Sequence, residues 1–559
     1  MVLVSFAEIF SIGAVLPFLA ALTNPERLFH HTLSRFFILN LGIRSPDQLL
    51  FLLTVIFGFA AFSAGALRLT LLRMSISLSY AVGADLSVDI YRRTLYQQYA
   101  IHTSRNSSEI IDGIMGKVGS VILVLSSMLT FLGSCVILVA ILFALIAIDP
   151  LVALSVFSGF GTIYLIITKV TQRRQLVNGQ LMARESIQLI KSLQEGLGGI
   201  RDILIDGTQE IYCNIYRSAD ISLRRAQGSS QFIAQSPRYG MEAFGMILIA
   251  LLAYALSYQA GGVAVAIPVL GALALGAQRL LPILQQAYQA WSSIQGQRAS
   301  LQDALDLLDQ PLPGYASESS PQPMSFQREI SFHQLGFKYS VNSPWVLKRL
   351  DLSIPKGGRI GFIGETGSGK STLLDIVMGL LMPTEGCMKI DGKTITVANH
   401  RAWQAHIAHV PQMIFLADAS IEENIAFGVP KDRIDLGKVK LAAQQAQISQ
   451  VIEGWDNGYH TMVGERGIRL SGGQRQRIGI ARALYKEADV IIFDEATSAL
   501  DGETELAVME SIEGLNKNLT ILIIAHRTST LKNCTQIVKL ANQTVERVGS
   551  YQEIIRSLP

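Results

Sequence analysis

The sequence predicts two unlike parts: an all-α membrane domain of six transmembrane helices with long cytoplasmic extensions, followed by an α/β domain with a P-loop. Six apolar runs in the first half are each long enough to cross a bilayer, which takes roughly 20 residues. The second half alternates short apolar runs with helical stretches, as α/β domains do. One of these runs leads into a glycine-rich phosphate-binding pattern. The overall composition, 49% hydrophobic and 16% charged, is then the average of two different halves.

The apolar runs also predict how the membrane helices are oriented. Two long polar stretches, 73–117 and 169–238, separate the second run from the third and the fourth from the fifth, and both carry several arginines. By the positive-inside rule, these stretches and both chain ends lie in the cytoplasm. We expect the stretches to be helices that leave the membrane and fold back at tips near 101–110 and 194–204, although simple turns fit those tips nearly as well. The six runs lie near residues 2–22, 49–70, 121–147, 151–170, 241–259 and 263–284.

Composition also sets the predicted domain boundaries. A stretch rich in Pro, Ser and Gly, QPLPGYASESSPQP, follows the helical pattern and is typical of a linker. We therefore predict a transmembrane domain over 1–310, a linker over 311–325 and a soluble domain over 326–559. The net charge of +3 gives no reason to expect a nucleic acid partner, and the four widely spaced cysteines indicate neither a disulfide framework nor a zinc site.

The glycine-rich segment GETGSGKST lies between the apolar strand RIGFI and a helical run, which is the context of a P-loop. Glycines let backbone N–H groups curl around a phosphate, and the helix N-terminus that follows favours negative charge. Lys370 is expected to reach the β- and γ-phosphates of a nucleotide, and Ser371 to ligate Mg²⁺. A glycine-rich turn is the alternative. The predicted phosphate-binding residues are Gly364, Glu365, Thr366, Gly367, Ser368, Gly369, Lys370, Ser371 and Thr372.

A second apolar run, VIIFDE, ends in two acidic residues. This fits a Walker B element, in which Asp494 belongs to the Mg²⁺ shell and Glu495 orients or deprotonates the attacking water. A core strand with a polar end would give the same pattern. The next motif decides between the two.

The sequence LSGGQ lies between these two motifs and is followed by RQRIGIARAL. It resembles the signature of ATP-binding-cassette (ABC) proteins, and the resemblance covers the whole soluble domain. It implies an α/β P-loop ATPase domain of the ABC type, with ATP and Mg²⁺ as cofactors. In this family the signature contacts the γ-phosphate bound by the other subunit, so the resemblance implies a dimer with shared ATP sites. The signature residues expected to bind ATP are Ser471, Gly472, Gly473 and Gln474.

Four further positions match the family one by one. Tyr339 is similar to the aromatic residue that stacks on adenine, and Gln412 to the Q-loop residue that senses Mg²⁺ and touches the membrane domain. Asp501 resembles the D-loop residue at the dimer interface, and His526 the switch histidine that contacts the γ-phosphate. Alone, Tyr339 could be a core aromatic and His526 a structural histidine. The resemblance implies a catalytic set of Glu495, His526, Gln412 and Lys370.

The run TMVGERG before the signature resembles an element of exporters that importers lack. Together with the predicted spans, it implies an ABC exporter half-transporter, a multi-pass protein of the bacterial inner (cytoplasmic) membrane with its ATPase domain in the cytosol. Since no motif looks degenerate, a homodimer with two active sites is favoured over a heterodimer with another chain. A soluble ABC ATPase of DNA repair or translation is a remote alternative, which six spans in the same chain disfavour.

The membrane part carries a weaker resemblance that concerns the cargo. The strings AEIFSIGAVLPFLAALTNPE, PRYGMEAFG and QRLLPIL are similar to PglK-type lipid-linked-oligosaccharide flippases and related bacterial polysaccharide exporters. This implies contact with membrane lipids and a substrate made of a glycan linked to a polyprenyl pyrophosphate, moved from the cytoplasmic to the outer leaflet. Exporters of peptides, drugs or lipid A-like lipids are the alternatives.

Three arginines give the glycolipid interpretation physical support. With a rise of about 1.5 Å per residue, Arg68, Arg238 and Arg279 lie at similar depths near the cytoplasmic edge of the hydrocarbon. Guanidinium groups bind pyrophosphate through paired N–H donors. Interfacial snorkelling or a positive-inside anchor explains each arginine taken singly more simply.

Overall fold

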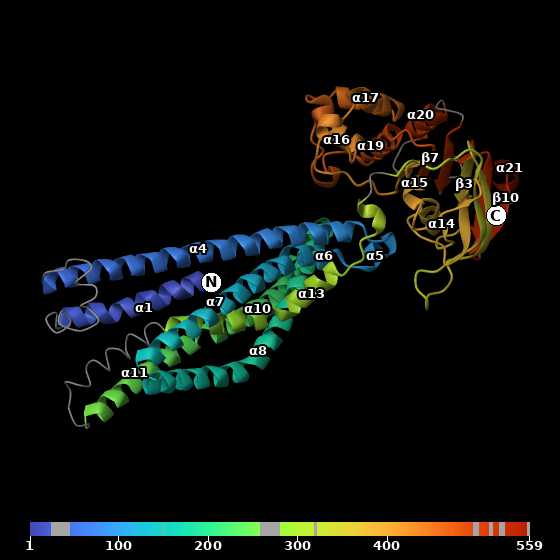
Figure 1. Ribbon diagram of the computed structural model, residues 1–559. Coiled ribbons are helices and arrows are strands. Elements are labelled where there is room, and N and C mark those ends of the chain that lie inside the picture. Colours follow the sequence, from blue (N-terminus) through green and yellow to red (C-terminus); the bar gives the residue numbers. More distant parts are fainter. Residues whose placement is uncertain are drawn as a thin grey trace. The chain divides into compact units, whose positions relative to one another are not determined.

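The computed structural model of the chain divides into two compact units (Figure 1). The first comprises Met1–Gln97 and Arg105–Leu312, and the second comprises Gln98–Ser104 and Pro313–Pro559. The last division falls inside the proline-rich segment. The structure describes residues 1–23, 45–148, 150–257, 280–317, 321–495, 502–513, 518–524 and 531–555.

The first unit is built from long helices. Helix α4 spans 50 residues, and at 1.5 Å per residue its length is about 75 Å, more than twice the thickness of the bilayer hydrocarbon. Ser45 accepts a hydrogen bond from the N–H of Gln48 and Pro46 takes the first helical position, two features that start a helix. A helix this long extends well beyond a bilayer, as expected for the cytoplasmic extensions. The helices are α1 (Val2–Thr23), α4 (Pro46–Leu95), α6 (Ser107–Asp112), the π-helix η1 (Gly113–Lys117), α7 (Val118–Ile148), α8 (Pro150–Gly198), α9 (Ile200–Asp206), α10 (Gln209–Gln235), α11 (Pro237–Ser257) and α13 (Arg298–Leu308), with further helical residues at 280–296.

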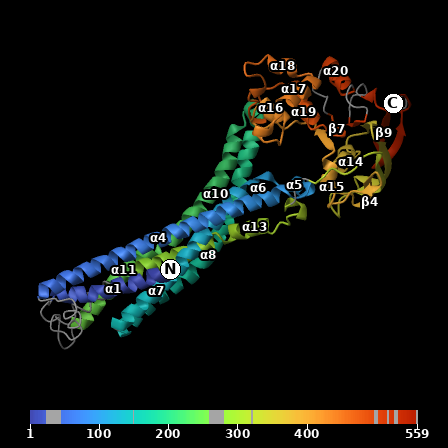
Figure 2. The same cartoon turned by 45° about the horizontal axis from the view of Figure 1, so that its top comes forward.

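The long helices pack side by side. Helix α1 packs along α4 and α7, and α8 packs along α10 (Figure 2). Short helices occupy the segments predicted as tips, with α5 (Tyr99–Ser104) and α6 at the first and α9 at the second. Gly207, at φ 65°, ends α9 in the left-handed conformation that favours glycine.

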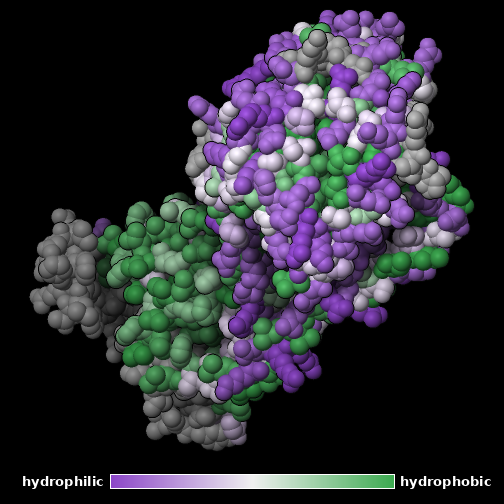
Figure 3. Space-filling model, turned by 90° about the vertical axis from the view of Figure 1, so that its right-hand side faces the viewer, coloured by the Kyte–Doolittle hydropathy of each residue, from purple (hydrophilic) through white to green (hydrophobic). Residues whose placement is uncertain are grey.

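Hydrophobic side chains cover much of the first unit's surface. Figure 3 shows a continuous hydrophobic area on this unit, and Phe51, Phe59 and Phe62 of α4 are 72%, 70% and 76% exposed. An exposed apolar area of this kind suits contact with lipid. Among the described residues, two helices, Pro46–Leu95 and Ser107–Phe143, are long and apolar enough to cross a membrane. The sixth predicted span lies mostly outside the described residues, so the count of six stays a prediction.

The second unit contains two sheets. The larger has the strand order β10-β9-β3-β8-β7-β6, and its strands from β9 to β6 pair in parallel. Residues of β8 are buried along the whole strand, as expected for a parallel strand covered on both faces. The smaller sheet is antiparallel, with the order β2-β1-β4-β5. The strands are β1 (Glu329–Phe337), β2 (Leu347–Pro355), β3 (Arg359–Ile363), β4 (Glu385–Ile390), β5 (Lys393–Thr394), β6 (Ile407–Val410), β7 (Val490–Asp494), β8 (Thr520–Ile524), β9 (Gln536–Ala541) and β10 (Thr544–Gly549).

Trp403 of helix α15 (His400–Gln404) contacts helix α14 (Lys370–Val377). The Trp403 side chain is fully buried, and its indole Nε1–H donates to the carbonyl oxygen of Val377 over 2.6 Å. This contact fixes the segment that leads into β6 against the helix that follows the P-loop. The other helices of the unit are α16 (Ile421–Ile425), α17 (Leu436–Gln445), α18 (Ser449–Glu453), α19 (Gly472–Tyr485), α20 (Gly502–Glu513) and α21 (Tyr551–Ile555), with short 3-10 turns at Gly314–Ser317, Lys431–Arg433, Gly458–His460 and Glu465–Gly467.

Replacing Trp403 with alanine is expected to lower the melting temperature of the full-length protein in detergent by about 10 °C. The substitution opens a cavity and leaves a carbonyl without its donor, at a combined cost of about 3–5 kcal/mol. Thermal denaturation followed by circular dichroism measures the shift. Leu441→Ala is the control, since Leu441 is 53% exposed. Equal shifts in the two variants would contradict the placement of Trp403 in the core.

Candidate active site

The parallel sheet brings several predicted site residues to one edge. Strands β3, β8, β7 and β6 are neighbours and parallel, so their carboxyl ends lie together. The P-loop follows β3, Asp494 and Glu495 lie at the end of β7, and Gln412 follows β6. Ligand sites in open α/β sheets lie at such carboxyl edges. The predicted P-loop and Walker B residues therefore meet, although more than a hundred residues separate them in the chain.

Lys370 lies at the centre of the P-loop. It begins α14, is 9% exposed, and donates through Nζ to the carbonyl oxygens of Gly364 and Glu365 over 2.8 and 2.9 Å. Burial lowers the pKa of Lys370, while the charges of Glu495 and Asp494 act in the opposite direction. The loop is thus closed around an ammonium group, with Ser371 exposed at the next position.

Gly369 shows why the loop needs glycine. Its φ is 93°, in the left-handed region. A Cβ added there would lie 2.7 Å from Cδ2 of Leu347 and 3.0 Å from the carbonyl oxygen of Val346. A side chain at this position would push the loop away from β2 and change the direction of its N–H groups.

Two carboxylates end strand β7. Burial raises the pKa of Asp494, the charge of Glu495 adds to the effect, and Lys370 opposes it. Glu495 has a φ of 51°, which is unusual for a residue other than glycine and turns the chain out of the strand. Its N–H donates to the carbonyl oxygen of Ile524, and its Oε2 accepts a hydrogen bond from Nε2 of Gln412 over 2.6 Å. The predicted Q-loop and Walker B residues are thus in direct contact.

Asp375 of α14 is a third carboxylate near this edge, and the sequence analysis did not single it out. Burial raises its pKa to about 6, and the charge of Asp494 adds to the effect. The available signal was an acidic residue in an otherwise apolar helical run. Across the described part of the chain, no group of three or more His, Cys, Asp or Glu side chains is arranged to hold a metal ion by itself. The Asp494 carboxylate and the Ser371 hydroxyl fit Mg²⁺, which takes oxygen ligands and usually keeps water and phosphate oxygens in its shell.

Tyr339 follows strand β1 beside the P-loop helix. Its hydroxyl is 3.0 Å from Oγ1 of Thr372, and its ring meets that of Phe337 edge to face with centroids 5.0 Å apart. The side chain is 55% exposed, so it is not a core aromatic. An open ring next to the P-loop is what stacking on a base requires.

The signature residues form the start of α19. Ser471 caps the helix by accepting from the N–H of Gln474 over 3.2 Å, and Oε1 of Gln474 accepts from the N–H of Ser471 over 2.8 Å. This reciprocal capping box explains why Ser and Gln stand three residues apart. Within the described ranges, no hydrogen bond or ion pair joins Ser471–Gln474 to the P-loop of the same chain. Gly472 instead lines a small pocket with Gln412.

The structure leaves three predicted site residues outside its described ranges, namely Asp501, His526 and Arg279. Of the remaining predicted substrate residues, Arg68 lies in α4 and Arg238 in α11. Arg238 donates through Nε to Oε1 of Glu242 over 2.8 Å. Its charge is thus already paired with a carboxylate one helical turn away.

Residues 347–498 match the family model described as ABC transporter. This part of the chain is an ATPase domain of the ABC transporter type. The match confirms the predicted enzyme class, an ATP hydrolase of the ABC transporter type, and such a domain implies ATP binding. It also agrees with the geometry, because the matched range begins with β2 and includes the P-loop, the signature and β7.

Two further comparisons cover most of the chain, and a third covers half of it. The chain is 28% identical over 503 residues to the ATP-dependent lipid A-core flippase of Cupriavidus metallidurans, a match that covers 89% of this chain and 82% of that protein. It is 39% identical over 286 residues to the leukotoxin export ATP-binding protein LtxB of Aggregatibacter actinomycetemcomitans, a match that covers 50% of this chain and only 39% of that protein. The structure of a bacterial Atm1-family ABC exporter with ATP bound superposes with a TM-score of 0.78, at 23% identity, over 98% of this chain and 95% of that one. The chain therefore shares the fold of that ABC exporter.

Gly369→Ala is expected to weaken ATP binding at least tenfold. The added Cβ meets Leu347 and displaces the N–H groups of the loop, and tenfold corresponds to only about 1.4 kcal/mol. Titration of the full-length protein with a fluorescent ATP analogue measures the affinity. Gly392→Ala is the matched control, because Gly392 has a φ of 87° but nothing within 4 Å of an added Cβ. Wild-type affinity in the Gly369 variant would show that the loop does not cradle phosphate.

Proposed function

We propose that this chain is one half of a homodimeric, ATP-driven exporter of the bacterial inner membrane, with its ATPase domain in the cytosol. The observation that carries the proposal is the meeting of Lys370, Asp494, Glu495 and Gln412 at one sheet edge, in a chain that also has long, apolar helices. ATP is the energy source, and the fused helical unit performs the transport. A heterodimer with another chain is the alternative assembly.

We propose that each ATP lies between two subunits. Lys370 and the P-loop N–H groups bind the phosphates and Tyr339 stacks on adenine, while Ser471, Gly472, Gly473 and Gln474 of the other subunit approach the γ-phosphate. The internal pairing of Ser471 with Gln474 supports this proposal, because it builds an ordered helix start without a hydrogen bond to the chain's own P-loop among the described residues. A helix N-terminus favours an anion. Asp501 and His526 complete this site in the proposal.

The hydrolysis chemistry follows from the end of β7. Mg²⁺ neutralises charge on the transferred phosphoryl group when it is bound. Ser371, Asp494 and Gln412 hold that ion, while Glu495 orients the attacking water and accepts its proton. Closure of the two ATPase domains drives the paired membrane domains from inward-facing to outward-facing, and hydrolysis resets them.

Glu495→Gln is expected to lower the kcat of ATP hydrolysis at least a hundredfold and to leave ATP binding intact. The amide keeps the size of the side chain but cannot accept the proton. Steady-state hydrolysis and nucleotide binding by the full-length protein are measured in parallel, with the exposed Glu385→Gln as the control. Turnover at the wild-type rate would show that Glu495 is not the base.

We propose a phosphorylated glycolipid as the cargo, and a lipid-linked oligosaccharide within that class. The short strings in the membrane half and the arginines Arg68, Arg238 and Arg279 support a ligand with phosphate groups. Arg238 must exchange Glu242 for the ligand. A lipid A-like lipid is the second candidate, because the lipid A-core flippase relative aligns over the membrane half as well as the ATPase domain.

Stimulation of ATP hydrolysis in liposomes distinguishes the cargo classes. A polyprenyl-pyrophosphate-linked oligosaccharide is expected to raise kcat several-fold, and Arg68→Ala and Arg279→Ala to weaken this response, since each removes a phosphate partner. Arg173→Ala is the matched control, because Arg173 is an exposed arginine of α8. Stimulation by lipid A alone would favour the second candidate, and stimulation by peptides or drugs alone would contradict the glycolipid class.

A further inference from the structure

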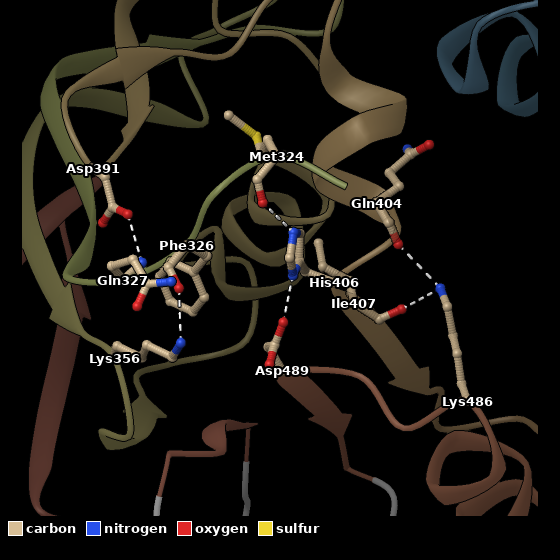
Figure 4. Close-up of polar contacts among 10 residues, drawn as sticks. All are labelled: Met324, Phe326, Gln327, Lys356, Asp391, Gln404, His406, Ile407, Lys486 and Asp489. Atoms are coloured by element: carbon tan, nitrogen blue, oxygen red, sulfur yellow. Dashed lines mark hydrogen bonds and ion pairs between the residues drawn. The ribbon is translucent and has the colours of Figure 1, made fainter. Parts of the chain in front are cut away.

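His406, just before strand β6, makes two hydrogen bonds with distant parts of the second unit. Its Nδ1 lies 2.5 Å from Oδ2 of Asp489, and its Nε2 lies 2.5 Å from the carbonyl oxygen of Met324 (Figure 4). Both partners are acceptors, so the ring serves both only when each nitrogen carries hydrogen. The side chain is 12% exposed and packs near Trp403, with ring centroids 5.8 Å apart.

The first partner, Asp489, connects His406 to the catalytic strand. Asp489 immediately precedes β7, which pairs in parallel with β6 from Ile407 opposite Val490 to Val410 opposite Phe493. The carbonyl oxygen of His406 also accepts from the N–H of Val490. The amino ends of the two strands are thus held together by His406, while their carboxyl ends are held together by Gln412 and Glu495.

The second partner, Met324, lies in residues 321–327, the connecting segment, which follows the division between the two units at Leu312 and Pro313. This segment is fastened to the ATPase unit at successive positions: the N–H of Met324 donates to the carbonyl oxygen of Ala402, and the N–H of Gln327 donates to Asp391. The carbonyl oxygen of Phe326 accepts from Nζ of Lys356 over 2.7 Å (Figure 4). His406 therefore links the connecting segment directly to the ends of two catalytic strands.

We propose that His406 is a positioning residue that transmits displacement of the connecting segment to the contact between Gln412 and Glu495. This inference rests on the proposed roles of those two residues in hydrolysis. Among the described strands, β6 stands at the edge of its sheet beside β7, so its position depends on the contacts at its ends. The strand is only four residues long, and a shift at His406 reaches Gln412 through a short extended backbone. A displacement of about 1 Å at a catalytic group is enough to change a rate strongly.

His406 contacts other strands than those that carry the residues proposed to bind ATP, so its effect on hydrolysis can be measured separately from ATP binding. Lys370 and Tyr339 follow β3 and β1, whereas His406 touches β6 and β7. Loss of the His406 contacts is therefore expected to act on kcat and to leave the KM for ATP nearly unchanged. A purely structural role would instead change kcat and KM together.

The first test replaces His406 with phenylalanine in the full-length protein, in vesicles of phosphatidylethanolamine and phosphatidylglycerol. The ring still packs against Trp403, but neither acceptor has a donor. The kcat of ATP hydrolysis is expected to fall about fivefold or more, the lower end of typical coupling between sites, with the KM near that of wild type. The melting temperature is expected to fall by a few degrees, because two acceptors lose their donor. Asp489→Asn should lower kcat in the same direction and serves if the first variant does not fold. His460→Phe is the matched control, because His460 also pairs with a carboxylate, that of Glu422.

A second test asks whether the connecting segment acts through His406. Two glycines inserted between Leu312 and Pro313 slacken the segment upstream of Met324, and they are expected to lower kcat in the wild-type background. In the His406→Phe background the insertion should lower kcat no further, because the hydrogen bond between His406 and the connecting segment is already absent. Three results would each overturn the proposal. They are losses of kcat that multiply in the double variant, a wild-type kcat in His406→Phe, and a rise in KM parallel to the fall in melting temperature.

Glu495→Gln, assayed alongside, distinguishes failure of this inference from failure of the proposed function. Normal turnover in Glu495→Gln would contradict the proposed function itself. An inactive Glu495→Gln with a normal His406→Phe would contradict only the positioning role of His406.

Discussion

Parallel pairing of β3, β8, β7 and β6 is the constraint on which the ATPase unit depends. Ile524 of β8 pairs with Phe362 of β3 on one side and with Asp494 of β7 on the other. This row lies two residues before the P-loop and one residue before Glu495, so the register of three strands determines where the P-loop meets the acidic pair. A slip of one residue would turn every side chain of a strand to the opposite face. Because these strands are buried, the hydrophobic core resists such a slip, and the geometry of the polar edge follows from apolar packing behind it.

Short-range patterns were sufficient to predict the parts of the site that are local in sequence. The glycines that the P-loop conformation requires all lie within nine consecutive residues. The acidic pair directly follows an apolar strand in the sequence. The start of α19 is equally local, since Ser471 and Gln474 cap each other. The long helices could be predicted because a continuous apolar run followed by an amphipathic run is compatible with few other structures. Local sequence patterns therefore predicted a P-loop and an acidic strand end, and the resemblance to ABC proteins implied the ATP chemistry.

Contacts between distant segments could not be predicted in the same way. The bond between Gln412 and Glu495 requires β6 to neighbour β7, and strand order is not written in either segment. His406 was missed for the same reason, since its two partners are about 80 residues away on opposite sides. Asp375 was missed because its chemistry depends on burial. Arg238 is a different case: Glu242 lies four residues along the same helix, a spacing that allows an ion pair and that the sequence already contained.

The carboxylates at the carboxyl edge of the parallel sheet favour ligand binding at a cost in folding stability. Burial raises the pKa of Asp375 and of Asp494 in the folded protein, and the neighbouring carboxylates raise them further. A carboxyl group whose pKa is higher in the folded than in the unfolded chain binds more protons when folded, so its effect on stability becomes less favourable as the pH rises from the ordinary value near 4 towards the raised one. At neutral pH these groups therefore destabilise the unit relative to exposed carboxylates. Lys370 offsets part of this repulsion, and a divalent cation would offset more. The charge arrangement that makes the edge unfavourable in isolation is thus the one that favours a nucleotide bound together with its metal ion.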